Sequence, residues 1–158
     1  MSDNTAGVSL APLIKTQNSY FKFLTQHSRL TGHYLEFGPD IGLFTENCVK
    51  QGSFDSYWLF EPNQAVWPTL QSKMEQQKYY LFSNIKELEA IPDNSISTVV
   101  MIHVLDHLID PQQTLQTITQ KLTPDGTILF VTHDERSLLA KISKRKWPPF
   151  CLQHPQLF

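Results

Sequence analysis

The chain has 158 residues, of which 41% are hydrophobic and 18% charged, and its formal net charge is −2. This composition predicts one globular domain with its own hydrophobic core, and the charge gives no basis for a nucleic acid or an anionic membrane as a partner. Two cysteines, Cys48 and Cys151, are too few for a disulfide framework or a four-cysteine zinc site.

Targeting and membrane signals are also missing from the sequence. No apolar run approaches the roughly 20 residues that a membrane-spanning helix needs. The amino-terminal residues MSDNTAGVSL lack the basic-then-apolar layout of a signal peptide. We therefore expect a soluble cytoplasmic protein.

The first predicted element is a helix. Residues 1–16 are typical of a loose, polar lead-in, and residues 18–28 then carry apolar side chains at helical spacing. These side chains are Tyr20, Phe21 and Leu24, with Phe23 less in phase. The pattern predicts an amphipathic helix ahead of the first strand.

Strands and helices alternate along the rest of the chain. The predicted strands are HYLEF (33–37), SYWLFEP (56–62), KYYLFS (78–83), ISTVVMIHV (96–104) and TILFVTH (127–133). The predicted helices are GLFTENCVKQG (42–52), residues 64–77 and DPQQTLQTITQKL (110–122).

Local signals mark the ends of these helices. Gly52 ends the first of them, and Asn63 can cap the second, in which Pro68 lies in the first turn or bends the helix. Asp110 caps the third, which is followed by TPDG (123–126), a turn signal. The buried stripe of the third helix is predicted to be Leu115, Ile118 and Leu122.

The alternation of strands and helices predicts a parallel, three-layer α/β domain. The strand at 96–104 is apolar on both sides, so it belongs in the middle of a sheet that is covered on both faces. Such a fold binds ligands at the carboxyl ends of its strands, near the topological switch point.

A glycine turn, an acid and an asparagine lie at the carboxyl ends of the first, second and third predicted strands. Gly38 and Gly42 lie in the turn after the first strand, where glycine lets the backbone approach a ligand. Glu61 closes the second strand, roughly 20 residues further on, as expected for an acid that binds ribose hydroxyls. Asn84, followed by the apolar Ile85, is placed to contact a base. Together they favour a nucleoside cofactor. The alternative is that the glycines only allow the helix to pack on the strand and that Glu61 is a solvated strand end.

The identity of the cofactor depends on the glycine spacing and on Glu36. A dinucleotide site normally reads G-x-G-x-x-G, whereas this turn reads G-x-x-x-G. Glu36, on the strand just before it, would repel a pyrophosphate and suits a cationic ligand. S-adenosylmethionine carries a ribose, an adenine, a sulfonium and an ammonium group, so it fits better than a nicotinamide cofactor or another nucleotide.

Several motifs, in order, resemble class I S-adenosylmethionine-dependent methyltransferases, in the branch that groups the type 11 and type 23 domains. LEFGPDIG (35–42) resembles their first motif, E/D-x-G-x-G-x-G, and LFEPN (59–63) resembles their acidic second motif. Further resemblance lies in IPDNSISTVVMIHVLDHLIDP (91–111), LTPDGTILFVTHD (122–134) and the tail KRKWPPFCLQHPQLF (144–158).

The resemblance implies which residues bind the cofactor. Glu36, Gly38 and Gly42 would surround its methionine part, and Glu61 would hold the ribose hydroxyls. The rest of the implied cofactor-binding set is Phe37, Asp40, Pro62, Asn84 and Ile85, the last two beside the adenine, and His103, near the sulfonium and the incoming substrate.

The chain departs from the family pattern in three ways. Asp40 replaces the middle glycine of the first motif, although aspartate tolerates the left-handed backbone better than most residues, and Ser97 stands where relatives commonly carry aspartate. The third departure is that the family fold has seven strands, in the order 3-2-1-4-5-7-6, whereas only five are predicted here. The expected fold is therefore a Rossmann-like sandwich with a mainly parallel sheet of order 3-2-1-4-5, without the 7-6 edge. We expect a lead-in and candidate lid at 1–32 and a carboxyl-terminally incomplete cofactor-binding core at 33–158.

The expected activity is methyl transfer to an unidentified small-molecule acceptor. Such a transfer is an in-line displacement in which positioning supplies much of the catalysis, and a base is needed only if the acceptor must lose a proton. The weak candidates for a base are His103, His107 and Asp106, so no catalytic residue is assigned. His103 is expected to shape the pocket, and His107 can equally be a helix-face histidine.

Other interpretations of these segments remain open. HVLDH (103–107) loosely echoes the zinc motif H-x-x-E-H, which needs a glutamate base and a third ligand further along the chain. Here the acid is aspartate, and His103 is expected to end a strand and not to lie on a helix, so we predict no metal. The basic run KISKRKW (141–147) is either a solvated helix end or a contact to an anionic substrate. The alternative functions are a non-catalytic, cofactor-binding or degenerate module, and a nicotinamide- or nucleotide-binding Rossmann domain.

Overall fold

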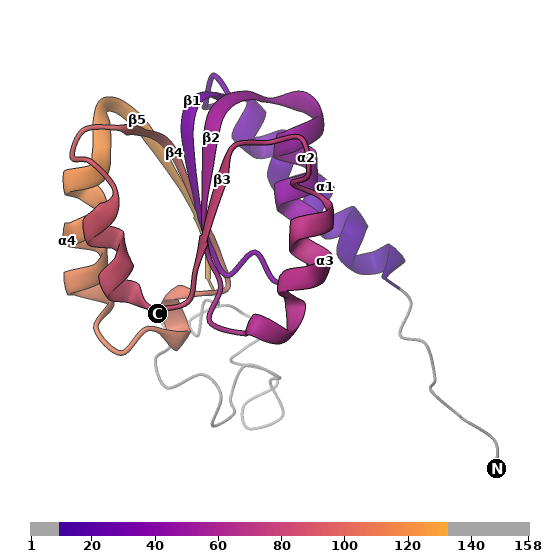
Figure 1. The fold of residues 1–158 in the computed structure, drawn as a ribbon. Helices are drawn as coiled ribbons and strands as arrows, with labels where there is room; N and C mark the ends of the chain where they lie inside the picture. The colour runs from indigo at the N-terminus through magenta and orange to yellow at the C-terminus, as the bar shows by residue number, and fades with distance from the viewer. Residues whose placement is uncertain (1–9, 133–158) are drawn as a thin grey trace, which may run out of the picture.

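Five parallel strands form one sheet in the order β3-β2-β1-β4-β5 (Figure 1). The computed structural model describes residues 10–132. The strands are β1 (Thr31–Phe37), β2 (Ser53–Phe60), β3 (Tyr79–Phe82), β4 (Ile96–Ile102) and β5 (Leu122–Val131). Both the parallel α/β class and the predicted strand order are confirmed, and β1 and β4 are the two strands flanking the switch point.

Helices cover both faces of this sheet, which makes the predicted three layers. Figure 1 shows α1, α2 and α3 on one face and α4 on the other. The α-helices are α1 (Ala11–Thr25), α2 (Leu43–Gln51), α3 (Trp67–Ser72) and α4 (Pro111–Lys121). Three short 3₁₀ helices follow strands, namely η1 (Gln64–Val66), η2 (Ile85–Ala90) and η3 (Leu105–His107).

Each face of the sheet has its own hydrophobic cluster. Successive strand residues point to opposite faces, so Tyr34 of β1 joins the cluster under α1, α2 and α3, while Leu35 joins the cluster under α4. Phe21 of α1 and Ile118 of α4 are buried in these two clusters respectively. The central strands are therefore buried from both sides, as predicted for residues 96–104.

The first helix begins earlier than the sequence predicts. It starts at Ala11 and not near Asn18, because Pro12 fits the first turn, where a missing N–H costs nothing. Only its second half reaches the core, through Phe21 and Leu24, and this is the half that the apolar spacing identified. The first half has no buried residue, and its apolar side chains Leu13 and Ile14 are 50% and 43% exposed.

The predicted helix over 64–77 is broken and shorter. Asn63 does cap it, since its side chain accepts a hydrogen bond from the Ala65 amide at 3.2 Å. The first turn is the 3₁₀ helix η1, and the α-helix begins afresh at Trp67 with Pro68 in its first turn. Proline cannot donate a hydrogen bond to the preceding turn, so one continuous α-helix does not form.

The predicted turn at 123–126 lies inside β5. Ile96 pairs with Leu122 and Thr98 with Thr127, so an advance of two residues along β4 corresponds to an advance of five along β5. The turn residues are accommodated as an irregularity in the register and do not precede the strand. The prediction of a separate turn is wrong because tertiary pairing already begins at Leu122.

The predicted helix caps are confirmed. The Asp110 side chain accepts a hydrogen bond from the Gln113 amide at 2.9 Å at the start of α4, and α2 ends at Gly52. Within residues 10–132, no helix is long and apolar enough to cross a membrane. Cys151, the basic run at 141–147 and the tail at 144–158 lie outside the described residues.

Candidate functional site

The turn between β1 and α2 is built from left-handed residues. Gly38, Asp40 and Gly42 have φ angles of 65°, 51° and 75°. A Cβ atom on Gly38 would lie 2.8 Å from Cγ2 of Val104, and one on Gly42 would lie 2.7 Å from Cδ1 of Leu70. Both glycines are therefore required by conformation and by space, and Asp40 adopts the backbone that aspartate tolerates.

Glu61 lies beneath this turn and connects it to the end of β2. Its carboxylate accepts hydrogen bonds from the Asp40 amide at 2.9 Å and from the Asn63 amide at 2.8 Å. Only 6% of Glu61 is exposed. The alternative that Glu61 is a solvated strand end is wrong, since the chain buries the carboxylate and holds it in one place.

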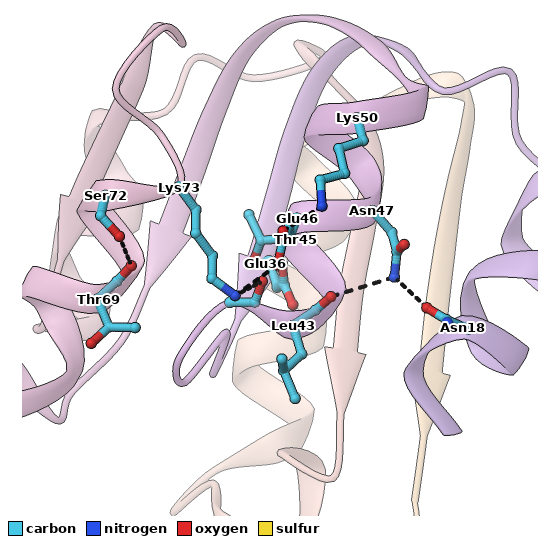
Figure 2. Close-up of polar contacts among 11 residues, drawn as sticks. Asn18, Glu36, Leu43, Thr45, Glu46, Asn47, Lys50, Thr69, Ser72 and Lys73 are labelled. Carbon is cyan, nitrogen blue, oxygen red and sulfur yellow. Dashed lines mark hydrogen bonds and ion pairs between the residues drawn. The ribbon is translucent and has the colours of Figure 1, made fainter. Parts of the chain in front are cut away.

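Glu36 is a second buried acid, placed on β1 directly before the turn. Its Oε2 atom accepts a hydrogen bond from the Tyr34 hydroxyl at 2.7 Å. The same atom accepts one from the Thr45 hydroxyl at 2.6 Å, and Figure 2 shows Thr45 beside Glu36. Burial raises its pKa to about 7; the two hydrogen bonds lower the pKa, and the nearby charge of Glu61 raises it further. Both the neutral and the charged carboxyl are therefore populated at neutral pH.

The start of α2 is fixed from both neighbouring helices. Asn47 of α2 donates a hydrogen bond from its side-chain nitrogen to the Asn18 side chain of α1 at 3.0 Å (Figure 2). Lys73, which follows α3, forms an ion pair with Glu46 at 2.9 Å and lies 3.4 Å from the Gly42 carbonyl oxygen. These contacts hold the turn at Gly38–Gly42 relative to α1 and α3.

Two cavities meet at Gly38. The smaller has a volume of about 170 Å³ and is lined by residues that include Gln17, Glu36, Asp40 and His103. The larger has a volume of about 950 Å³ and lies between the ends of β2, β3 and β4. Its lining includes Pro62, Asn84, Ile85, Val104 and His107.

The cavities divide most of the predicted cofactor-binding residues between them. Three predicted residues line neither cavity: Phe37, Gly42 and Glu61. Phe37 is fully buried, with its ring 5.3 Å from that of Phe60, so its side chain belongs to the core. Gly42 caps α2, and Glu61 supports the turn from below.

The amino-acid sequence matches a known family. Residues 15–158 match the family described as "Methyltransferase domain". The chain belongs to this family. The match covers most of the chain and confirms the resemblance that the ordered motifs predict. A comparison with curated protein sequences finds no match.

Solved methyltransferase structures share the fold at low sequence identity. A SAM-dependent methyltransferase from Archaeoglobus fulgidus is 18% identical, with a TM-score of 0.68, over 85% of this chain and 57% of its own. One from Leishmania major is 20% identical, with a TM-score of 0.59, over 84% of this chain and 58% of its own. The DhpI protein in complex with SAH is 15% identical, with a TM-score of 0.62, over 80% of this chain and 62% of its own.

These likenesses establish the Rossmann-like methyltransferase fold. The chain spans less than two thirds of the length of each of these three solved chains.

The two histidines of HVLDH (103–107) line different cavities in this methyltransferase domain. His103 follows β4 with a φ of 53° and lines the smaller cavity, with its ring 6.4 Å from that of Tyr20. His107 ends η3 and lines the larger cavity. His103 comes directly after β4 and does not lie on a helix, so the two histidines do not share a helical face. No group of three or more metal-binding side chains occurs in residues 10–132.

Asn84 has a local role that the sequence analysis did not include. Its side-chain oxygen accepts a hydrogen bond from the Lys86 amide at 3.0 Å, and the Glu87 side chain accepts one from the Asn84 amide at 3.0 Å. This capping box starts η2. The oxygen is used by the cap, so the side-chain nitrogen is the atom placed to donate to a base.

Sequence reasoning missed three residues of the site. Tyr34 lies two positions before Glu36, and the period of a strand places both side chains on one face, so this partner was open to prediction. Thr45, on the next helix, and Gln17, on α1, approach Glu36 or its cavity only through tertiary packing. No local pattern in the sequence indicates either.

Proposed function

We propose that this chain binds S-adenosylmethionine and transfers its methyl group to a small-molecule acceptor. The observation that carries the proposal is the buried Glu61 carboxylate, held under the glycine turn by the amides of Asp40 and Asn63. It stands at the carboxyl end of β2, beside the switch point between β1 and β4, where such folds bind nucleosides.

The smaller cavity suits the cationic end of this cofactor. Glu36 and Asp40 line it, and no lysine or arginine among residues 10–132 does. A sulfonium and an ammonium group would be stabilised by these acids, whereas a pyrophosphate would be repelled. The charge of the cavity therefore supports S-adenosylmethionine over a dinucleotide.

The larger cavity suits the adenine end. Ile85, which is 37% exposed, offers an apolar face, and Pro62 and Leu88 add further apolar lining. The Asn84 side-chain nitrogen can donate a hydrogen bond to a ring nitrogen of the base. Since Gly38 lines both cavities, one ligand can extend from one to the other across the glycine turn.

The chemistry of the proposed reaction rests on positioning. The bound cofactor supplies a methyl group already activated by its sulfonium, so the chain has to align the acceptor for in-line displacement. His103 lines the cavity assigned to the sulfonium end, and we propose that it shapes the acceptor's approach. His107 lies in the adenine cavity, which makes it the weaker candidate for a base.

Calorimetric titration with S-adenosylmethionine, S-adenosylhomocysteine and a nicotinamide cofactor tests the proposal. Heat of binding is expected with the first two and not with the third. Absence of binding by both sulfur ligands would overturn it.

Transfer of a labelled methyl group is the second test. A panel of small-molecule acceptors should yield at least one methylated product. Binding without any transfer would favour a non-catalytic cofactor-binding module, which Asp40 at a glycine position of the first motif also favours.

A further inference from the structure

Gln17 carries a buried polar atom for which residues 10–132 provide no partner. It lies on α1, and its Oε1 atom is fully buried without a hydrogen bond from the described chain. The same residue lines the smaller cavity together with Glu36 and Asp40. Buried side-chain oxygens in native proteins are nearly always hydrogen-bonded, so this atom calls for a donor.

The packing of α1 holds Gln17 in this position. Gln17, Phe21 and Leu24 follow one another at helical spacing on the inner face of the helix. The Phe21 ring lies 5.9 Å from the Phe44 ring of α2, and Asn18 accepts the hydrogen bond from Asn47 (Figure 2). Both contacts attach α1 to α2 within the turn of helix that follows Gln17.

The chemistry of the cavity explains what Gln17 contributes. Glu36 and Asp40 can stabilise an ammonium group, but their charges oppose a carboxylate. A carboxamide has both an acceptor oxygen and a donor nitrogen and carries no charge. It can therefore contact the ammonium and the carboxylate of an amino acid together.

We propose that Gln17 binds the amino-acid part of S-adenosylmethionine, so that α1 forms a wall of the cofactor site. This inference rests on the proposed function. The first helix is thereby assigned to the cofactor, whereas the sequence predicts only a lead-in and candidate lid at 1–32.

Gln17→Leu tests the proposal because it keeps the size of the side chain and removes both polar groups. Calorimetry compares S-adenosylhomocysteine with 5′-methylthioadenosine, which lacks the amino-acid part. The affinity for S-adenosylhomocysteine should fall about 10-fold or more, and that for methylthioadenosine should not change. Gln116→Leu, the same change at an exposed position of α4, is the matched control and should alter neither.

Hydrogen exchange on the unaltered chain gives a second readout. The amides of α1 should gain more protection with S-adenosylhomocysteine than with methylthioadenosine, because only the former reaches Gln17. Equal protection, or an unchanged affinity in Gln17→Leu, would overturn the role of Gln17 alone. Failure of the unaltered chain to bind S-adenosylhomocysteine would overturn the proposed function itself.

Discussion

The two cavities that meet at Gly38 differ in chemistry. The smaller one is lined by the acids Glu36 and Asp40 and by no lysine or arginine of residues 10–132. The larger one has apolar lining such as Ile85 and Leu88, and its acids Glu89 and Asp110 are accompanied by Lys86. The same glycine turn thus adjoins a site suited to positive charge and a site suited to a flat apolar group. One strand–turn–helix unit can therefore adjoin both ends of an extended ligand.

The two cavities also differ in what holds them in shape. Glu36 is fixed by hydrogen bonds from Tyr34 and Thr45, so the smaller cavity depends on a polar network. The larger cavity adjoins the core through Phe60 and Leu88, which are almost fully buried. We therefore expect the first to respond to pH and charge, and the second to side-chain volume.

The largest expected effect is a pH dependence of stability caused by Glu36. Its pKa is about 7 in the folded chain, against an ordinary value of 4.5, so between these values the folded chain binds more protons than the unfolded chain. The free energy of unfolding should then fall as pH rises from about 4.5 to about 7, by about 3 kcal/mol from this group.

Urea unfolding across this pH range measures the effect. Glu36→Gln cannot ionise, so it should lack this part of the slope, and the difference between the two chains isolates Glu36 from other titrating groups. Equal slopes in the two chains would show that Glu36 is not the source.

Glu61→Ala is expected to weaken the binding of S-adenosylmethionine and of methylthioadenosine equally. It removes the proposed ribose acceptor and leaves the amides of Asp40 and Asn63 without their partner. The affinity for S-adenosylmethionine should fall by about 1.5–3 kcal/mol, as for loss of a charged hydrogen-bonding partner. Calorimetry measures this loss, and methylthioadenosine should lose a similar amount. An unchanged affinity for either ligand contradicts the ribose assignment.

Gly38→Ala tests the point at which the cavities meet. The left-handed backbone costs an alanine about 1–2 kcal/mol, and its Cβ would crowd Val104. Denaturant unfolding should show this loss of stability. The double variant Gly38→Ala with Val104→Ala relieves the crowding but keeps the backbone strain. If the changes in the free energy of unfolding caused by Gly38→Ala and Val104→Ala simply add in the double variant, steric contact is not part of the effect.

Ile85→Ala is expected to give the smallest change. Ile85 is partly exposed, so removing its apolar surface should weaken adenine binding by about 1 kcal/mol or less. The loss should be equal for S-adenosylhomocysteine and methylthioadenosine, unlike that in Gln17→Leu. A loss confined to S-adenosylhomocysteine would place Ile85 away from the adenine.

The features of the site that could be predicted from the sequence depend on local patterns. Gly38 and Gly42, the acid at the end of β2 and the cap at Asp110 all depend on residues within one strand–turn–helix unit. Strand periodicity and turn chemistry act over such short distances, so they are visible in the sequence. The parallel order 3-2-1-4-5 was open to prediction because the ordered motifs resemble a family with that topology.

The sequence by itself determined the class of fold and the chain positions of the acids and glycines. Only the tertiary structure decided that Thr45 and Gln17 join Glu36, that His103 and His107 line different cavities, and that β5 begins at Leu122. The physical reason is that these contacts join residues on separate elements. Their distances depend on how helices pack on the sheet and how strands pair, and no short stretch of sequence records either.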